Sequence, residues 1–166
     1  NQSANLTFFG VSITGNVIAL MNGEACGDIC GSVTNTLTTY YFNVSHFTNY
    51  SVGDMIGCED TMTSSKRMYT NISCLGTAIN IGASNIVLDC DGYIINYSTS
   101  GTNNTYGINN TGGYDNVTIK NCDIVEGNSS ESNKYGIYFK NADNGTITNN
   151  NITTSGTSGF GMRLIS

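Results

Sequence analysis

The chain has 166 residues and a formal net charge of -6, and only 11% of its residues are charged. It contains just six lysines and arginines. Nucleic acids and anionic membrane surfaces are bound by clustered basic residues, so the composition argues against both as partners. No run of about 18 apolar residues is present, so we also expect no membrane span.

The N-terminal part, residues 1–73, is predicted to be β-rich and irregular. The stretches 6–21 and 38–44 are rich in aliphatic, β-branched and aromatic residues, which favours strands. The lone histidine of the chain, His46, follows the second stretch and is interpreted as an ordinary surface or turn residue. We assign to residues 1–73 the role of a cap or an assembly segment.

The cysteine count is even, which together with the sequons described below favours an oxidising compartment and up to three disulfides. The spacing of the first two cysteines would also suit a metal ligand pair. Zinc usually needs further cysteines or histidines at close spacing, and these are missing, so no metal site is predicted. Sequence does not choose the pairing among Cys26, Cys30, Cys58, Cys74, Cys90 and Cys122.

Asparagine is heavily over-used, and 12 of the 24 asparagines begin an Asn-x-Ser/Thr sequon. Chance would give roughly five, so we favour real N-glycosylation over accidental sequons in Asn- and Thr-rich turns. Covalent N-glycans are the only cofactor-like groups expected. They would supply the solubility that charge does not. The predicted sites are Asn1, Asn5, Asn43, Asn49, Asn71, Asn96, Asn103, Asn109, Asn116, Asn128, Asn144 and Asn151.

From about residue 76 the chain repeats itself. The leading apolar residues Ile79, Ile108, Ile137 and Met162 are spaced 29, 29 and 25 residues apart. Within each unit apolar and polar residues alternate with a period of two, which predicts short strands with one buried face. Stacked coils would bury columns of aliphatic side chains that no single coil can bury alone.

Two further ladders are expected at equivalent positions of neighbouring coils. Asn121 and Asn149 would form an asparagine ladder, and Tyr106 and Tyr135 would stack their rings. The predicted fold is therefore all-β, with a right-handed parallel β-helix over residues 74–166. Residues 1–73 would be an N-terminal disulfide-stapled β cap, because an open solenoid end exposes unpaired strand edges.

The phrases at 85–94, 106–108 and 116–122 resemble the parallel β-helix repeats of the pectate-lyase-like superfamily. They are most similar to the Asn-rich versions in surface glycoproteins of archaea and bacteria. The resemblance covers roughly residues 74–166. It implies the fold, but it says little about function, because this fold hosts many activities.

Because that superfamily includes polysaccharide lyases and hydrolases, the acidic residues of the repeats are the candidates for acid–base work or calcium binding. We interpret them as turn residues, since Asp and Asn both make Asx turns, and we predict no catalytic residue. Basic partners are sparse. The acids are Asp89, Asp91, Asp115, Asp123, Glu126, Glu131 and Asp143.

The function expected from these features is that of an extracellular structural glycoprotein, a repeating subunit of a surface filament, sheath or surface layer. Self-association would use an uncapped coil, with residues 6–21 donated as a strand to another subunit. The alternative is a carbohydrate-binding or polysaccharide-degrading β-helix module of a larger secreted protein.

Overall fold

The computed structural model describes residues 3–13, 16–36, 38–45 and 48–166, and within these it is almost entirely β-structure. His46 and Asn1 lie outside the described residues. The chain divides into two compact units, Asn1–Met55 and Ile56–Ser166. In the described part, no helix is long and apolar enough to cross a membrane.

The N-terminal unit contains two antiparallel three-stranded sheets. Their inner faces share a small core that includes Ala19, Phe42 and Val44, with the Phe42 ring stacked 5.7 Å from that of Phe8. The strands predicted within 6–21 and 38–44 are confirmed. One sheet has the order β1 (Ala4–Phe8), β5 (Thr39–Val44), β4 (Thr34–Thr36), and the other β3 (Glu24–Ala25), β2 (Asn16–Met21), β6 (Tyr50–Met55); a 3-10 turn spans Gly27–Ile29.

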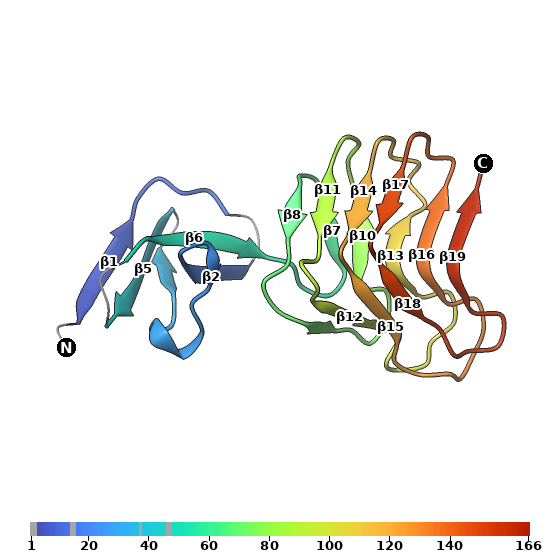
Figure 1. Cartoon of the computed structure of the whole chain (residues 1–166), viewed down its shortest axis with the longest axis horizontal. Helices are drawn as coiled ribbons and strands as arrows, with labels where there is room; N and C mark the ends of the chain where they lie inside the picture. The colour runs from blue at the N-terminus through green and yellow to red at the C-terminus, as the bar shows by residue number, and fades with distance from the viewer. Residues whose placement is uncertain (1–2, 14–15, 37, 46–47) are drawn as a thin grey trace. The chain divides into compact units, whose positions relative to one another are not determined.

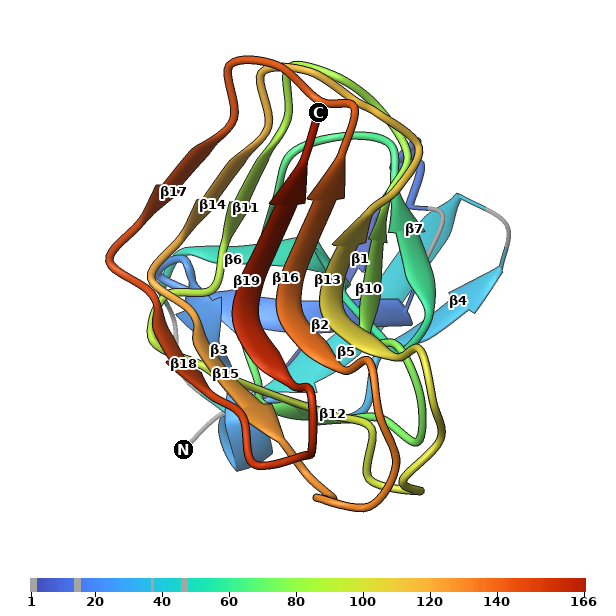
Figure 2. The ribbon, with the colours of Figure 1, turned by 90° about the vertical axis from the view of Figure 1, so that its right-hand side faces the viewer.

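The C-terminal unit is a parallel β-solenoid built from three sheets, as the repeat predicted (Figure 1). Seen from its C-terminal end, the chain advances toward the viewer with a counter-clockwise turn, which makes the coil right-handed (Figure 2). Sheet I contains β7 (Asp60–Met62), β10 (Ile79–Ile81), β13 (Tyr106–Asn110), β16 (Tyr135–Lys140) and β19 (Phe160–Ile165). Sheet II contains β8 (Lys66–Arg67), β11 (Val87–Asp89), β14 (Thr118–Lys120) and β17 (Thr146–Thr148). Sheet III contains β9 (Ile72–Ser73), β12 (Ile94–Tyr97), β15 (Asp123–Glu126) and β18 (Asn151–Thr153).

The core of the solenoid consists of aliphatic columns that run from coil to coil. Ile79 pairs with Ile108, and Ile108 with Ile137, and all three side chains are completely buried. This confirms the predicted interior column. Burying one such side chain stabilises the fold by about 1.5–3 kcal/mol, so each coil depends on its neighbours for most of its stability.

Asparagines form the corners of the coils because they tolerate the left-handed backbone conformation. Asn85, Asn116 and Asn144 occupy one such corner with φ of 61°, 54° and 55°. The Nδ2 atom of Asn116 donates to Oδ1 of Asn85 over 3.0 Å, which makes one rung of an asparagine ladder. A separate hydrogen bond of the same kind, from Asn109 to Asn80 over 2.9 Å, joins the paired strands β13 and β10 away from the corners.

The ladder predicted at Asn121 and Asn149 takes a different form. Both residues have positive φ, 57° and 53°, so their shared role as corners is correct. The side chain of Asn121, however, donates to Oδ1 of Asp89 in the preceding coil over 2.9 Å. A carboxylate is a stronger acceptor than an amide oxygen, so it takes the amide donor.

The solenoid begins earlier than the repeat in the sequence indicated. Strands β7, β8 and β9 pair in parallel with β10, β11 and β12, and the compact unit starts at Ile56. This first coil is short, since Asp60 pairs with Ile79 only 19 residues later. It also places Lys66 beside Leu88, at a position where later coils have an aliphatic residue. Because of its short length and this lysine, the first coil does not match the sequence repeat.

The six cysteines form three disulfides, Cys26–Cys30, Cys58–Cys74 and Cys90–Cys122. The last one joins two successive coils inside the core, because both cysteines are almost completely buried. Structural disulfides of this kind are typical of proteins in an oxidising environment.

Candidate functional site

The acidic residues considered for catalysis are held in structural contacts. Asp89 accepts hydrogen bonds from Asn121 and from the backbone N–H of Asp91, and its carboxylate lies 2.9 Å from the ammonium of Lys120. Burial raises the pKa of Asp89, but the hydrogen bonds and the charge of Lys120 outweigh it, so the net pKa lies below its ordinary value. Asp91 pairs with Arg67 over 2.5 Å.

The remaining acids lie at separate places on the solenoid. Asp115 and Asp143 occupy neighbouring coils between sheets I and II, where the carboxylate of Asp115 accepts the backbone N–H of Asp143 over 2.7 Å. Asp123 lies at the start of β15 in sheet III and accepts the amide of Asn151 over 3.1 Å. Among the residues that the structure describes, no group of three or more His, Cys, Asp and Glu side chains is placed to hold a metal ion.

None of the described asparagines of the predicted sequons is buried. Asn96, Asn109 and Asn128 are half-buried, and Oδ1 of Asn96 is itself buried without a hydrogen-bond partner. Asn5 and Asn43 are register partners on β1 and β5. The exposed ones are Asn5, Asn43, Asn49, Asn71, Asn103, Asn116, Asn144 and Asn151.

An aromatic cluster covers part of the outer face of sheet I. The rings of Tyr106 and Tyr135 stack with centroids 5.6 Å apart, which confirms the predicted tyrosine ladder. Tyr138 contacts both rings, and the guanidinium of Arg163 lies over Tyr135 and Tyr138 at 5.0 and 5.7 Å. Burial and the neighbouring tyrosines raise the pKa of Tyr106, so its phenol stays protonated at neutral pH.

A polar groove of about 560 Å³ opens near the same sheet, between the first and second coils. Asn80, which lines it, is in register with Asn109, and Asn109 is in register with Tyr138 in the aromatic cluster. The groove and the aromatic cluster therefore lie along one outer face. The groove is lined by Glu59, Leu75, Gly76, Thr77, Asn80, Ser100, Thr102 and Thr105.

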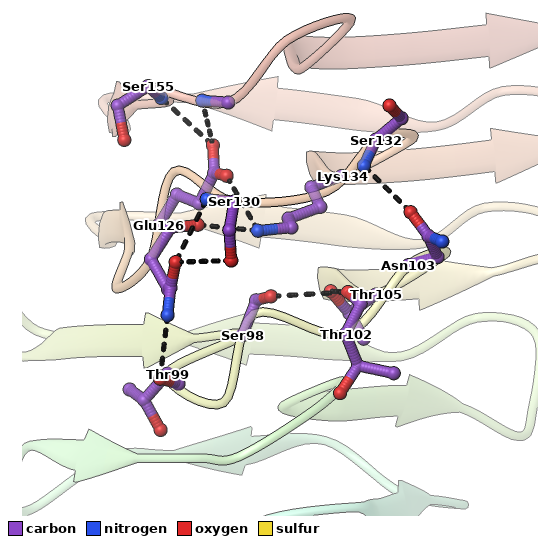
Figure 3. Close-up of polar contacts among 12 residues, drawn as sticks. Ser98, Thr99, Thr102, Asn103, Thr105, Glu126, Ser130, Ser132, Lys134 and Ser155 are labelled. Atoms are coloured by element: carbon purple, nitrogen blue, oxygen red, sulfur yellow. Dashed lines mark hydrogen bonds and ion pairs between the residues drawn. The ribbon is translucent and has the colours of Figure 1, made fainter.

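The loops that lead from sheet III back to sheet I contain a buried polar cluster, which sequence reasoning did not find (Figure 3). Its centre is an ion pair between Glu126 and Lys134, whose atoms Oε1 and Nζ lie 3.3 Å apart and whose side chains are both fully buried. Backbone N–H groups of Ser155 and Gly156 also donate to the Glu126 carboxylate. The only signal in the sequence was a lone lysine at the end of a Ser/Asn-rich loop, which reads as a surface residue.

The C-terminal end of the solenoid presents an apolar surface. The fully buried column of Ile108 and Ile137 continues into Met162, which is 50% exposed, and Phe139, 5% exposed, is followed by Leu164 at 63%. A cavity of about 330 Å³ opens beside this end. It is lined by Phe139, Ala142, Gly145, Ile147, Leu164, Ile165 and Ser166.

No protein-family model, curated protein or solved structure matches this chain.

Proposed function

We propose that this chain is a structural subunit of an extracellular glycoprotein assembly in which β-solenoids stack end to end. The observation that carries the proposal is the solenoid itself, in which every coil adds one parallel strand to each of three sheets and covers the apolar columns of the coil before it. In the last coil of this sequence, Met162 and Leu164 carry on the columns of Ile137 and Phe139 with 50% and 63% of their surface exposed, and β19 is the outermost strand of sheet I. Such an edge templates the addition of a further parallel strand.

The partner is a second copy of the chain. Strands β7, β8 and β9 form the opposite edge of the same three sheets, so each strand at the end formed by β19, β17 and β18 has a counterpart to pair with, although the first coil is shorter. Contact between two different ends of identical subunits is heterologous, and stacking along the axis of the solenoid continues it into an open filament rather than a closed ring. The donation of residues 6–21 to another subunit is not part of this proposal, because β1 and β2 are already paired within the N-terminal unit.

Three further features support a surface location. The accessible sequons would carry glycans, the disulfides suit an oxidising compartment, and the low charge of the chain leaves solubility to the glycans. The resemblance to the pectate-lyase-like repeats of Asn-rich surface glycoproteins points the same way.

The test compares the glycosylated full chain with the variant Met162→Lys/Leu164→Lys by electron microscopy and light scattering. We expect the wild-type chain to form filaments and the variant to remain monomeric, because each lysine would lose its hydration in the contact. The matched control, Thr102→Lys/Ser129→Lys, adds the same charge to exposed loop positions of earlier coils, keeps every sequon and should still assemble. A wild-type chain that stays monomeric at high concentration, or filaments unaffected by the first variant, would refute the proposal.

Carbohydrate binding is a second candidate, favoured by the outer face of sheet I. The exposed ring of Phe160, the half-buried Tyr138 and the guanidinium of Arg163 form a surface on which sugar rings can stack, and the polar groove continues it. Isothermal titration with acidic and neutral polysaccharides should then give an affinity that Tyr138→Ala weakens about tenfold, equivalent to about 1.4 kcal/mol. Thr148→Ala, on sheet II, is the control.

A further inference from the structure

The ion pair between Glu126 and Lys134 has features that a stabilising salt bridge does not need. Glu126 ends β15 and Lys134 precedes β16, so the two residues enclose one loop. Both side chains have no exposed surface, and burying two charges usually costs more than their attraction returns. The Nζ atom of Lys134 donates to the backbone oxygen of Asn128 over 2.5 Å, which fixes the amine in place.

The two oxygens of the Glu126 carboxylate are in different surroundings. Oε2 accepts two backbone N–H groups, from Ser155 over 2.9 Å and from Gly156 over 3.1 Å. Two amide donors on one oxygen are the arrangement that stabilises the oxyanion of an acyl-transfer intermediate. Oε1 has no hydrogen-bond partner, and although Nζ lies 3.3 Å away, the geometry of that contact is not that of a hydrogen bond.

Glycines allow the last loop to close over this carboxylate. A Cβ atom on Gly156 would lie 2.6 Å from Oε1 of Glu126, and one on Gly159 would lie 3.3 Å from Oε2. Because neither residue has a side chain, the backbone covers the carboxylate directly and keeps water away from it. A dry site favours a condensation, whose other product is water.

We propose that Lys134 and Glu126 join in an intramolecular isopeptide bond, formed by the folded chain itself. A proton passes from the ammonium to Oε1, which gives a neutral amine and a neutral acid. The Nζ lone pair then attacks Cδ, and the negative charge that develops on Oε2 is held by the N–H groups of Ser155 and Gly156. The Nζ–Cδ bond forms, the Cδ–Oε1 bond breaks, and Oε1 leaves as water with a second proton from Nζ.

The amide product fits the site better than the ion pair does. Oε2 becomes the amide oxygen and keeps both backbone donors, and the remaining N–H on Nζ can still donate to the oxygen of Asn128. The unpartnered oxygen, Oε1, is the atom that departs. The reaction thus removes a buried unsatisfied acceptor and two buried charges in one step.

The proximity of the two groups accelerates the reaction. Amine and carboxyl are held together by the fold, and well-oriented intramolecular reactions gain effective molarities of about 10⁵ M or more. Tyr97, the register partner of Glu126 on β12, is fully buried, and its phenolic oxygen has no hydrogen-bond partner. Burial and the charge of Glu126 raise the pKa of this phenol, so Tyr97 stays protonated and adds no further charge to the buried site.

The test is mass spectrometry of the full chain produced in a bacterial periplasm, which forms disulfides. Without N-glycosylation, the reduced and denatured chain should weigh one water molecule less than its sequence. Trypsin cuts after unmodified lysine, so the bond should protect Lys134 and yield the peptide 121–140, also lighter by one water. Fragmentation should place the link between Glu126 and Lys134.

The matched variant is Lys134→Arg, which keeps the positive charge but has no nucleophilic amine. It should show its full sequence mass and normal cleavage at position 134. Water loss located instead at Asp91-Gly92, where a cyclic imide can form, would refute the proposal. So would a correctly folded wild-type chain with its full mass, since the pair would then be an ordinary buried salt bridge.

Discussion

The ammonium of Lys120 lies 2.9 Å from the carboxylate of Asp89, which belongs to the strand paired with its own in the preceding coil. The same carboxylate accepts the side chain of Asn121 and the backbone of Asp91, so three donors converge on one acid at the corner between sheets II and III. Asp89, one of the acids considered for catalysis from the sequence, therefore links two neighbouring coils.

These contacts of Asp89 should make the free energy of unfolding depend on pH in the acidic range. The pKa of Asp89 is lower in the folded chain than its ordinary value of 3.8, so its contribution is complete above that value. The contribution is lost as pH falls through the depressed folded pKa, where the unfolded chain binds the proton first. In Asp89→Asn, the free energy of unfolding should therefore fall less steeply between about pH 5 and about pH 2. Urea unfolding at several pH values measures this, and a slope in Asp89→Asn as steep as that of the wild-type chain would contradict it.

Removing the disulfide between coils should weaken the solenoid. Cys90 and Cys122 have a sequence separation of 32. Disulfides that close loops of this kind typically stabilise the folded state by about 2–4 kcal/mol. Cys90→Ala/Cys122→Ala should lower the free energy of unfolding of the C-terminal unit by that amount. Cys26→Ala/Cys30→Ala, which opens a link with a sequence separation of 4, should cost less. Equal losses in denaturant titrations would contradict the loop-entropy argument.

Truncating the central column should be costly only where the column is covered. Ile108 is fully buried between Ile79 and Ile137, so Ile108→Ala should lower the free energy of unfolding by about 2–5 kcal/mol. Met162, half-exposed in the same column, should cost under about 1 kcal/mol when replaced by alanine in a monomeric sample. Thermal and urea unfolding of both variants checks the difference, and similar costs would mean that the end is covered.

Two equivalent glycines should tolerate a methyl group differently. A Cβ on Gly136 would lie 2.3 Å from the side chain of Ile152 and 2.7 Å from the backbone oxygen of Gly161. Gly136→Ala should therefore destabilise the chain by about 1–3 kcal/mol through overpacking. In the next coil, a Cβ on Gly161 meets ordinary contacts of 3.6 Å or more, so Gly161→Ala should be nearly neutral. Comparison of the melting temperatures of the two variants tests whether the corner between sheets I and III leaves no room for a methyl group at Gly136.

The sequence determined the solenoid because its signal is periodic. Ile79, Ile108 and Ile137 recur at a constant interval, and parallel stacking follows from the need of each coil to bury one face. Tyr106 and Tyr135 stack for the same reason, since equivalent positions in neighbouring coils lie side by side. Composition also argued against nucleic acid as a partner, because the number of lysines and arginines in a chain does not depend on its fold.

Only the tertiary structure decided which residues of different types contact one another. The disulfide partners, the three donors on Asp89 and the buried pair of Glu126 and Lys134 depend on distances across coils and loops of irregular length. The first coil could not be predicted from the repeat for a related reason. Its short length and Lys66 break the spacing of apolar residues, although its backbone still pairs with the second coil. A repeat fixes what lies above and below each residue, but the path of every loop is set by packing, and it is the loop between β15 and β16 that brings Lys134 to Glu126.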